Sequence, residues 1–320
     1  MFHSHAHAHI GIDRVGALDR SLRILQPGPL ATVQDLGRAG FGHLGVPRSG
    51  AADRQSLLLA TALVGNHPEA ACLEVTLGRL AVRFDCHAVA ALTGAPVPLR
   101  LTAPDGTRRE PAAGTAFEVL AGSVLRLGSP PAGLRSYLAV DGGIAVPPVL
   151  GSRSADLRSG LGPPALRAGQ RLPLGPRADI SRAVAARPGA PAGPAAAVAA
   201  RAAGPAGAAE LRVVAGPRDD WFIPGALSAL TGGSYRVTAA SDRTGLRLAG
   251  PALRRATRAE LPSEGIATGS LQVSHDGQPI LLLADHPVTG GYPVVAVVRT
   301  ADIAAAAQLR PGQLVRFLAG

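Results

Sequence analysis

The sequence predicts a mainly β protein with a few short helices, folded as two β-barrel domains that a flexible Ala/Pro-rich linker joins. Three observations predict this class. Short apolar runs end at Gly, Pro or Asp-Gly turns, few segments show helical spacing, and residues 176–209 are almost entirely Ala, Pro, Gly and Arg. The 320 residues therefore divide into domains at 22–175 and 210–320, each of ordinary domain size.

The first 21 residues are expected to form a disordered tail. His3, His5, His7 and His9 alternate along it, and such a segment would chelate a transition metal if it were extended. No apolar cluster anchors the chain before Leu22, so disorder is the favoured interpretation. We assign no metal site to the fold.

The elements of the first domain follow in chain order. A helix is expected at 51–64, with Ser49 or Gly50 as its N-cap and Gly65-Asn66 as its end. Asp53 falls near the positive end of its dipole. The clearest strands are expected at 88–94, 117–128 and 134–140.

The second domain shows the same kind of pattern. Strands are expected at 270–273, 279–285 and 293–298, and short helices at 224–230 and 302–309. The two domains also have similar ends, "LRILQPGP" with "LRVVAGPR" and "LRAGQRLPLG" with "LRPGQLVRFLAG". A duplicated architecture and independent convergence of strand, turn and strand units both explain these matches.

The composition excludes several function classes. The chain has no lysine, so all 32 basic residues are arginine; a P-loop, a pyridoxal Schiff base and a biotin attachment site each need a lysine. The net charge is +10, but the arginines are scattered and aromatic residues are few, which argues against nucleic-acid binding. No apolar run is long enough to span a membrane, and Cys72 and Cys86 lack the spacing of a disulfide framework. These features indicate a cytoplasmic protein.

A glycine-rich stretch, "QDLGRAGFGHLGVPRSGAAD", covers residues 34–53. Its "GFGHLG" fits G-x-G-x-x-G, but Pro47 stops a helix from starting there, so a dinucleotide site is rejected. Glycines allow the backbone to approach a ligand closely, and the following helix can hold an anion at its N-terminus. The side chains that project from this stretch are Gln34, Asp35, Arg38, His43, Arg48 and Ser49. Asp35 and Arg38 alternatively pair and cap turns, which would make the loop structural.

Polar clusters at strand ends of the second segment match this loop. They are "GPRDDWF" with Arg218 and Asp219, "SDRTG" with Asp242 and Arg243, "PSEG" with Glu264, and "ADHPVTGGYP" with Asp285, Thr289 and Tyr292. Loops at one end of a rigid β scaffold collect binding groups, so we expect one site between the two segments.

These motifs together resemble the biotin-dependent carboxyltransferase family. The resemblance rests on "GPLATVQDLGRAGFGHLGVPRSGAAD", "LEVTLG", "YLAVDGGI", "VLGSRSADL", "GPRDDWF", "SDRTGLRL" and "LQVSHDGQPILLLADHPVTGGYPVV". The family includes the C subunit of bacterial 5-oxoprolinase, the Kip antagonist proteins, the second allophanate-hydrolase-type subunit and the carboxyltransferase domain of urea carboxylase. The chain departs from it in its histidine tail, its long linker and "SHDGQP" where a Pro is expected before Asp-Gly.

The resemblance implies two cyclophilin-like β-barrels and three alternative functions. The first is the C subunit of an ATP-dependent 5-oxoprolinase, which opens the lactam 5-oxoproline to glutamate with a Kip-inhibitor-like B subunit and a lactam-utilisation-like A subunit. The second is carboxyl transfer from carboxybiotin, carried by a partner, to a urea-like amide. The third is a non-catalytic antagonist of a kinase inhibitor. We favour the first.

The candidate site follows from motif position and chemistry. Opening a lactam needs donors for a developing anion and a carboxylate base for water. The residues assigned to catalysis are Asp35, Arg38, Asp219, Arg243 and Glu264. Those assigned to substrate binding are Gln34, His43, Ser49, Arg153, Arg218, Gln278, Asp285, Thr289 and Tyr292.

Overall fold

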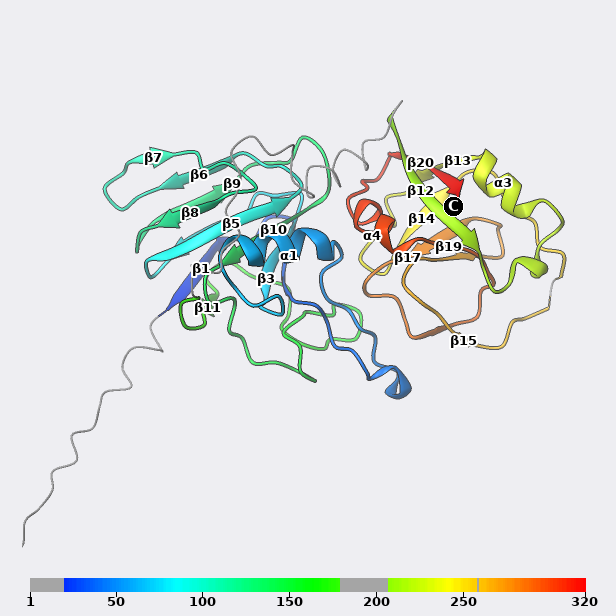
Figure 1. Ribbon diagram of the computed structural model, residues 1–320, viewed down its shortest axis with the longest axis horizontal. Coiled ribbons are helices and arrows are strands. Elements are labelled where there is room, and N and C mark those ends of the chain that lie inside the picture. The colour runs from blue at the N-terminus through cyan, green and yellow to red at the C-terminus, as the bar shows by residue number, and fades with distance from the viewer. Residues whose placement is uncertain (1–19, 179–206, 258) are drawn as a thin grey trace, which may run out of the picture.

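The computed structural model describes residues 20–178, 207–257 and 259–320 and shows two lobes side by side (Figure 1). Strands dominate both lobes, and the α-helices in these residues are α1 (Arg54–Leu63), α3 (Ala226–Gly232) and α4 (Thr300–Ala306). The predicted mainly β class with a few short helices is confirmed. Most of the expected tail at 1–21 and linker at 176–209 lies outside the described residues, but strands β1 and β12 begin inside these segments, at Ser21 and Ala208.

Two sheets that share one core form the first domain. In order across the sheet, the first contains β11 (Arg171–Pro173), β1 (Ser21–Gln26), β4 (Ala81–Phe84), β9 (Val124–Leu127), β6 (Leu99–Thr102) and β7 (Arg108–Arg109). The second contains β2 (Leu30–Gln34), β3 (Cys72–Thr76), β10 (Arg135–Val140), β5 (Ala88–Gly94) and β8 (Ala116–Val119). Alternate apolar side chains of both sheets meet in a single buried cluster. Within the described chain, a closed ring of paired strands occurs in the second domain alone.

Helix α1 covers the outer face of the second sheet. Its Leu57 and Ala60 pack with Tyr137 and Ala139 of β10 in a second apolar cluster. Strand β10 is therefore buried along its whole length, since one face meets the main core and the other meets the helix. This packing fixes the N-terminus of α1 at the boundary with the second domain, where α1 faces α4 (Figure 1).

The start of α1 differs from the prediction. Asp53 is the N-cap, and its side chain accepts a hydrogen bond from the Ser56 backbone N–H. Ser49 and Gly50 both have positive φ, 52° and 90°, so the chain turns tightly there before the helix begins. A Cβ atom on Gly50 would lie 2.7 Å from the Gly37 nitrogen, which shows that this turn packs against the preceding loop.

A closed barrel of seven strands forms the second domain. Its order is β12 (Ala208–Ala215), β19 (Val294–Val298), β16 (Ser270–Val273), β17 (Pro279–Leu282), β14 (Gly245–Ala249), β13 (Ser234–Val237) and β20 (Leu314–Ala319). The short 3-10 helix η4 (Asp219–Trp221) follows β12, and the two-residue strands β15 (Glu264–Gly265) and β18 (Thr289–Gly290) pair with each other outside the ring. The first domain carries one further 3-10 helix, η1 (Gly42–Leu44).

The similar ends of the two domains pair in opposite ways. In the first domain β1 and β11 run antiparallel, whereas in the second domain β12 and β20 run parallel over six residue pairs, from Ala208 with Leu314 to Val213 with Ala319. The matching end motifs therefore occupy different strand arrangements, which favours convergence of strand and turn units over a simple duplication.

Gln308, just after α4, connects the two domains. Its side-chain oxygen accepts from the backbone N–H groups of Leu134 and Arg135, both at 2.9 Å, and its nitrogen donates to the Asp53 carboxylate at 2.8 Å. The same nitrogen donates to the Arg135 carbonyl at 3.0 Å. Since Gln308 is 1% exposed, these bonds satisfy a fully buried amide at the interface.

Replacing Gln308 tests this connection. Gln308→Leu should lower the free energy of unfolding by about 2–4 kcal/mol, because it leaves two buried N–H groups without an acceptor. Urea unfolding measures this, with Gln26→Leu as the matched control, since Gln26 is exposed on β1. An equal effect of the two substitutions would contradict the assignment.

Candidate functional site

Asp35 holds the glycine-rich loop to residues 152–154. Its carboxylate accepts from the backbone N–H groups of Gly37 and Arg153 at 2.8 and 2.6 Å. It also accepts from the hydroxyls of Ser152 and Ser154 at 2.6 and 2.5 Å. Four bonds use the usual acceptor capacity of a carboxylate, and the side chain is buried. The turn-capping role that was the alternative for Asp35 is therefore what this geometry supports, and not a role as a catalytic base.

Arg38 and Gln34 lie beside the same segment. Arg38 is 2% exposed and donates to the carbonyl of Ser154, but within the described residues it forms no ion pair with Asp35. Gln34 donates to the Ala155 carbonyl at 2.9 Å and to the Thr32 hydroxyl at 3.1 Å. In the same part of the chain, Arg38 Nη1 and Gln34 Oε1 have no hydrogen-bond partner. Both side chains therefore mainly tie the glycine-rich loop to residues 154–155.

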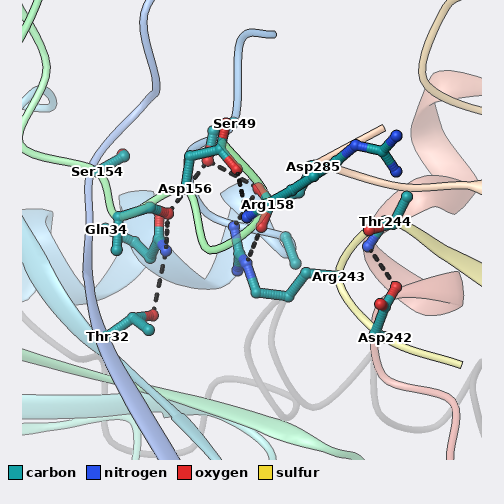
Figure 2. Close-up of polar contacts among 12 residues, drawn as sticks. Thr32, Gln34, Ser49, Ser154, Asp156, Arg158, Asp242, Arg243, Thr244 and Asp285 are labelled. Atoms are coloured by element: carbon teal, nitrogen blue, oxygen red, sulfur yellow. Dashed lines mark hydrogen bonds and ion pairs between the residues drawn. The ribbon is translucent and has the colours of Figure 1, made fainter. Parts of the chain in front are cut away.

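Arg243 carries the contact between the domains. Its Nε and Nη2 donate to the Asp285 carboxylate at 2.8 and 3.1 Å. Its Nη1 reaches Glu74 of the first domain, and Nη2 donates to the Gly50 carbonyl at 2.5 Å. Asp285 in turn accepts from the Ser49 hydroxyl at 2.7 Å (Figure 2). These bonds bring three of the predicted site residues, Ser49, Arg243 and Asp285, together at the domain boundary.

Glu74 completes this buried network. It accepts from the Ala52 backbone N–H at 3.0 Å and the Tyr137 hydroxyl at 2.8 Å. Its Oε1 lies 3.6 Å from Arg135 Nε. Burial alone would raise the pKa of Glu74, but the charges of Arg243 and Arg135 outweigh it and lower that pKa. The same two carboxylates, Glu74 and Asp285, raise the pKa of Arg243 despite its burial. Two acids and two arginines therefore balance in charge.

A cleft of about 500 Å³ opens on this network between the domains. Its polar lining includes Arg243 and Asp285, together with Arg158, Asp242 and Thr244. Asp242 Oδ1 accepts from the Thr244 N–H at 2.7 Å, and its Oδ2 has no partner in the described chain. The Arg158 guanidinium also has none there and extends away from the network (Figure 2). Counting only the described residues, the cleft thus presents one cation and one carboxylate oxygen without a partner, beside a wall whose charges are paired.

The other second-domain candidates do not join this cleft. Arg218 and Glu264 form an ion pair with side chains 36% and 29% exposed, and Asp219 is exposed in η4. Glu264 lies opposite Gly290 in the β15–β18 pair. Gln278 bonds to the backbone of Gly250 at 2.9 and 3.2 Å. Exposure and pairing of this kind are typical of surface structure.

The remaining candidates are split between smaller features. His43 and Thr289 line a neighbouring cleft of about 410 Å³ between the domains, which Arg158 also lines. Tyr292 packs against His275 and Arg255, with ring centroids 5.5 Å apart in the first pair. Arg153 donates through Nε to the Val146 carbonyl at 2.8 Å. The residues predicted to form one site are therefore divided among several separate groups.

Sequence reasoning missed Glu74, Arg135 and Arg158 as site residues. Glu74 stands in "LEVTLG" and Arg158 just after "VLGSRSADL", so both lie in or next to motifs that carry the family resemblance.

Among the described residues no group of three potential metal ligands occurs. No helix in this part of the chain combines the length and apolar character needed to cross a bilayer.

Comparison with known proteins gives the class to which this fold and site belong. The family model for the carboxyltransferase domain, subdomain A and B, matches residues 44–319. The chain therefore belongs to this carboxyltransferase family, and the resemblance seen in the motifs is confirmed.

Particular relatives can then be named. The chain is similar to the C subunit of 5-oxoprolinase from Escherichia coli, 38% identical over 93% of this chain and 90% of that protein, and from Haemophilus influenzae, 31% identical over 92% and 89%. It is also similar to urea amidolyase of Saccharomyces cerevisiae, 30% identical over 93% of this chain but only 16% of that protein.

Solved structures agree with this placement. The crystal structure of TTHA0988 has a TM-score of 0.80 at 35% identity, and the match covers 94% of this chain and 56% of that one. The urea amidolyase of K. lactis gives 0.80 at 28% identity, over 96% of this chain and 19% of that one. The chain thus spans about half of the first protein and a fifth of the second.

Replacing Arg243 tests the buried network. Arg243→Gln should lower the free energy of unfolding by about 3–5 kcal/mol at pH 7, because Glu74 and Asp285 are left buried without their cation. In the native protein the stabilisation from Glu74 is present above its ordinary pKa of 4.5 and is lost as the pH falls from there through the lowered folded-state pKa. In the variant the Glu74 carboxylate loses the charge of Arg243 that lowers its pKa, so it protonates more readily and the difference from the native protein should shrink toward pH 4.

Urea unfolding at pH 7 and pH 4 provides the measurement. Arg247→Gln is the matched control, because Arg247 is exposed on β14 and should cost about 0.5 kcal/mol or less. A loss that is the same at both pH values would show that charge does not cause it.

Proposed function

We propose that this chain is the C subunit of an ATP-dependent 5-oxoprolinase. The observation that carries the proposal is the similarity to two proteins named as that subunit, over about nine-tenths of both their length and this chain. A relation over the whole chain includes the loops that form the interdomain cleft, and function resides in such loops more than in the scaffold.

The proposed partners are a Kip-inhibitor-like B subunit and a lactam-utilisation-like A subunit, in the cytoplasm, with ATP as a substrate of the complex. ATP transfers its γ-phosphoryl group to the lactam oxygen and ADP is released. Water then attacks the activated carbon, the ring C–N bond breaks as its nitrogen takes up a proton, and phosphate leaves as the new carboxylate forms. The chain has no lysine, so a P-loop cannot hold the nucleotide here. We therefore propose that ATP is held by a partner or at a shared interface.

The interdomain cleft suggests which residues of this chain take part. Arg158 is the cation at the cleft that is not already bonded within the described residues, so it is the group best placed to hold a developing anion. Asp242 supplies a free carboxylate oxygen for proton transfer. Arg243 and Asp285, assigned directly to chemistry or substrate from the sequence, instead position this wall, because their charges are already paired with each other and with Glu74.

The test is to co-express the three subunits and follow 5-oxoproline-dependent release of ADP. Arg158→Gln should reduce kcat/KM about a hundredfold, which is typical for loss of one donor to a developing anion. Asp242→Asn should reduce it similarly while keeping the bond to the Thr244 N–H. Arg100→Gln and Asp105→Asn are matched controls at exposed positions. Absence of turnover with all three subunits folded would overturn the function itself, whereas full activity of both variants would overturn only the residue assignment.

A second candidate function is carboxyl transfer to a urea-like amide. The observation that favours it is the similarity to two urea amidolyases, 29% and 30% identical over 93% of this chain. Since this chain has no lysine, carboxybiotin would have to be carried by a partner.

A streptavidin blot of proteins that co-purify with the chain from its native source separates the two functions. The 5-oxoprolinase proposal predicts no biotinylated companion. A stoichiometric biotinylated partner would favour carboxyl transfer instead.

A further inference from the structure

A third cleft lies between the domains and shares Ser49 with the network of Arg243. It has a volume of about 290 Å³ and runs between the start of α1 and the start of α4. Ser49 lines this cleft, and its hydroxyl bonds to Asp285, which lines the first one. This cleft and the cleft beside Arg243 therefore lie on either side of a thin wall, and the cleft at the start of α1 forms no part of the function proposed above.

The charge of this cleft is unbalanced. Arg48 and Arg54 line it, and no aspartate or glutamate of the described chain does. Within residues 20–178, 207–257 and 259–320, neither arginine has a carboxylate partner; Arg48 makes only a long contact of 3.4 Å from Nε to the Leu36 carbonyl. By contrast, the arginines of the first wall, Arg135 and Arg243, are both matched by carboxylates.

The two cations also repel each other. Partial burial, and next to it the charge of Arg48, lower the pKa of Arg54. Arg48 is exposed and Arg54 is partly buried, so water screens part of this repulsion. Nothing in the packing requires the two charges to share one cleft, since α1 is held by Leu57, Ala60 and Leu63 on its other side. Such an arrangement is relieved when an anion binds between the two guanidinium groups.

The remaining lining suits a small oxyanion. The backbone N–H groups of Arg54 and Gln55 open α1 and have no acceptor in the described chain, because the Asp53 side chain caps Ser56. Thr268 and Thr300 add hydroxyls from the second domain, and Ile303 adds an apolar wall. An apolar wall lowers the local dielectric and strengthens charge interactions.

We propose that this cleft is an anion-binding site in which Arg48 and Arg54 hold one carboxylate or phosphate group. Both chemistries present oxygens that match the planar guanidinium fork. Two sources are open to experiment: the carboxylate of an amino-acid-like compound and the phosphate of a nucleotide. The second domain supplies one wall, so an anion bound here contacts both domains.

Isothermal titration calorimetry of the full chain at constant ionic strength tests the site. The probes are inorganic phosphate, glutamate and ATP. We expect saturable binding of at least one probe, weakened about tenfold or more by Arg54→Gln and further by the double substitution with Arg48→Gln. Tighter binding of ATP than of phosphate identifies a nucleotide source, and binding of glutamate alone identifies a carboxylate.

Two controls keep the test decisive. Arg100→Gln removes an exposed arginine that does not line the cleft and should leave the dissociation constant unchanged, although it alters the net charge equally. Arg54→Gln retains helix propensity and relieves repulsion, so without anion its thermal midpoint should equal or exceed that of the native protein. No saturable binding of any probe, or equal weakening by Arg54→Gln and Arg100→Gln, would overturn the proposal.

Discussion

The contact between Arg243 and the two carboxylates Glu74 and Asp285 is the constraint on which the arrangement of the two domains depends. Arg243 and Asp285 belong to the second domain, while Glu74, Ser49 and the Gly50 carbonyl belong to the first. Each group is buried, so none keeps water as an alternative partner. Removing any charge would leave another unpaired in a medium of low dielectric. The network therefore requires one relative position of the domains, and this position creates the clefts on both sides of it.

The glycine-rich loop brings its backbone to this contact. Gly37 and Gly50 have positive φ and approach each other so closely that no side chain would fit. Asp35 ties the loop to residues 152–154, and Ser49 then presents its hydroxyl to Asp285. The polar residues of the loop were interpreted from the sequence as ligand groups, and the structure shows that many of them shape the surface that ligands would meet.

Sequence patterns located several strands of each domain because apolar alternation between turn residues is a local signal. Strands β5 and β16 coincide with the predicted ranges of 88–94 and 270–273. The start of α1 was misplaced because Ser49 is a good N-cap residue by type, and only the tertiary bond to Asp285 shows that its hydroxyl is used elsewhere. Which charges lie together was predictable in part: Arg243 and Asp285 were expected at one site and do bond to each other, but Glu74 lies inside a strand and gave no local sign of its partner. Arg218 and Glu264, equally polar, pair at the surface instead.

Because the bridging cation is an arginine, the interdomain ion pairs respond differently to acid and to alkali. A guanidinium keeps its proton in any aqueous medium that a protein tolerates, and the neighbouring carboxylates hold the Arg243 proton still more firmly. Alkaline conditions therefore cannot discharge the bridge, as they would if an amine stood in its place. Only acid, by protonating the carboxylates that bond to Arg243, weakens the ion pairs between the two lobes.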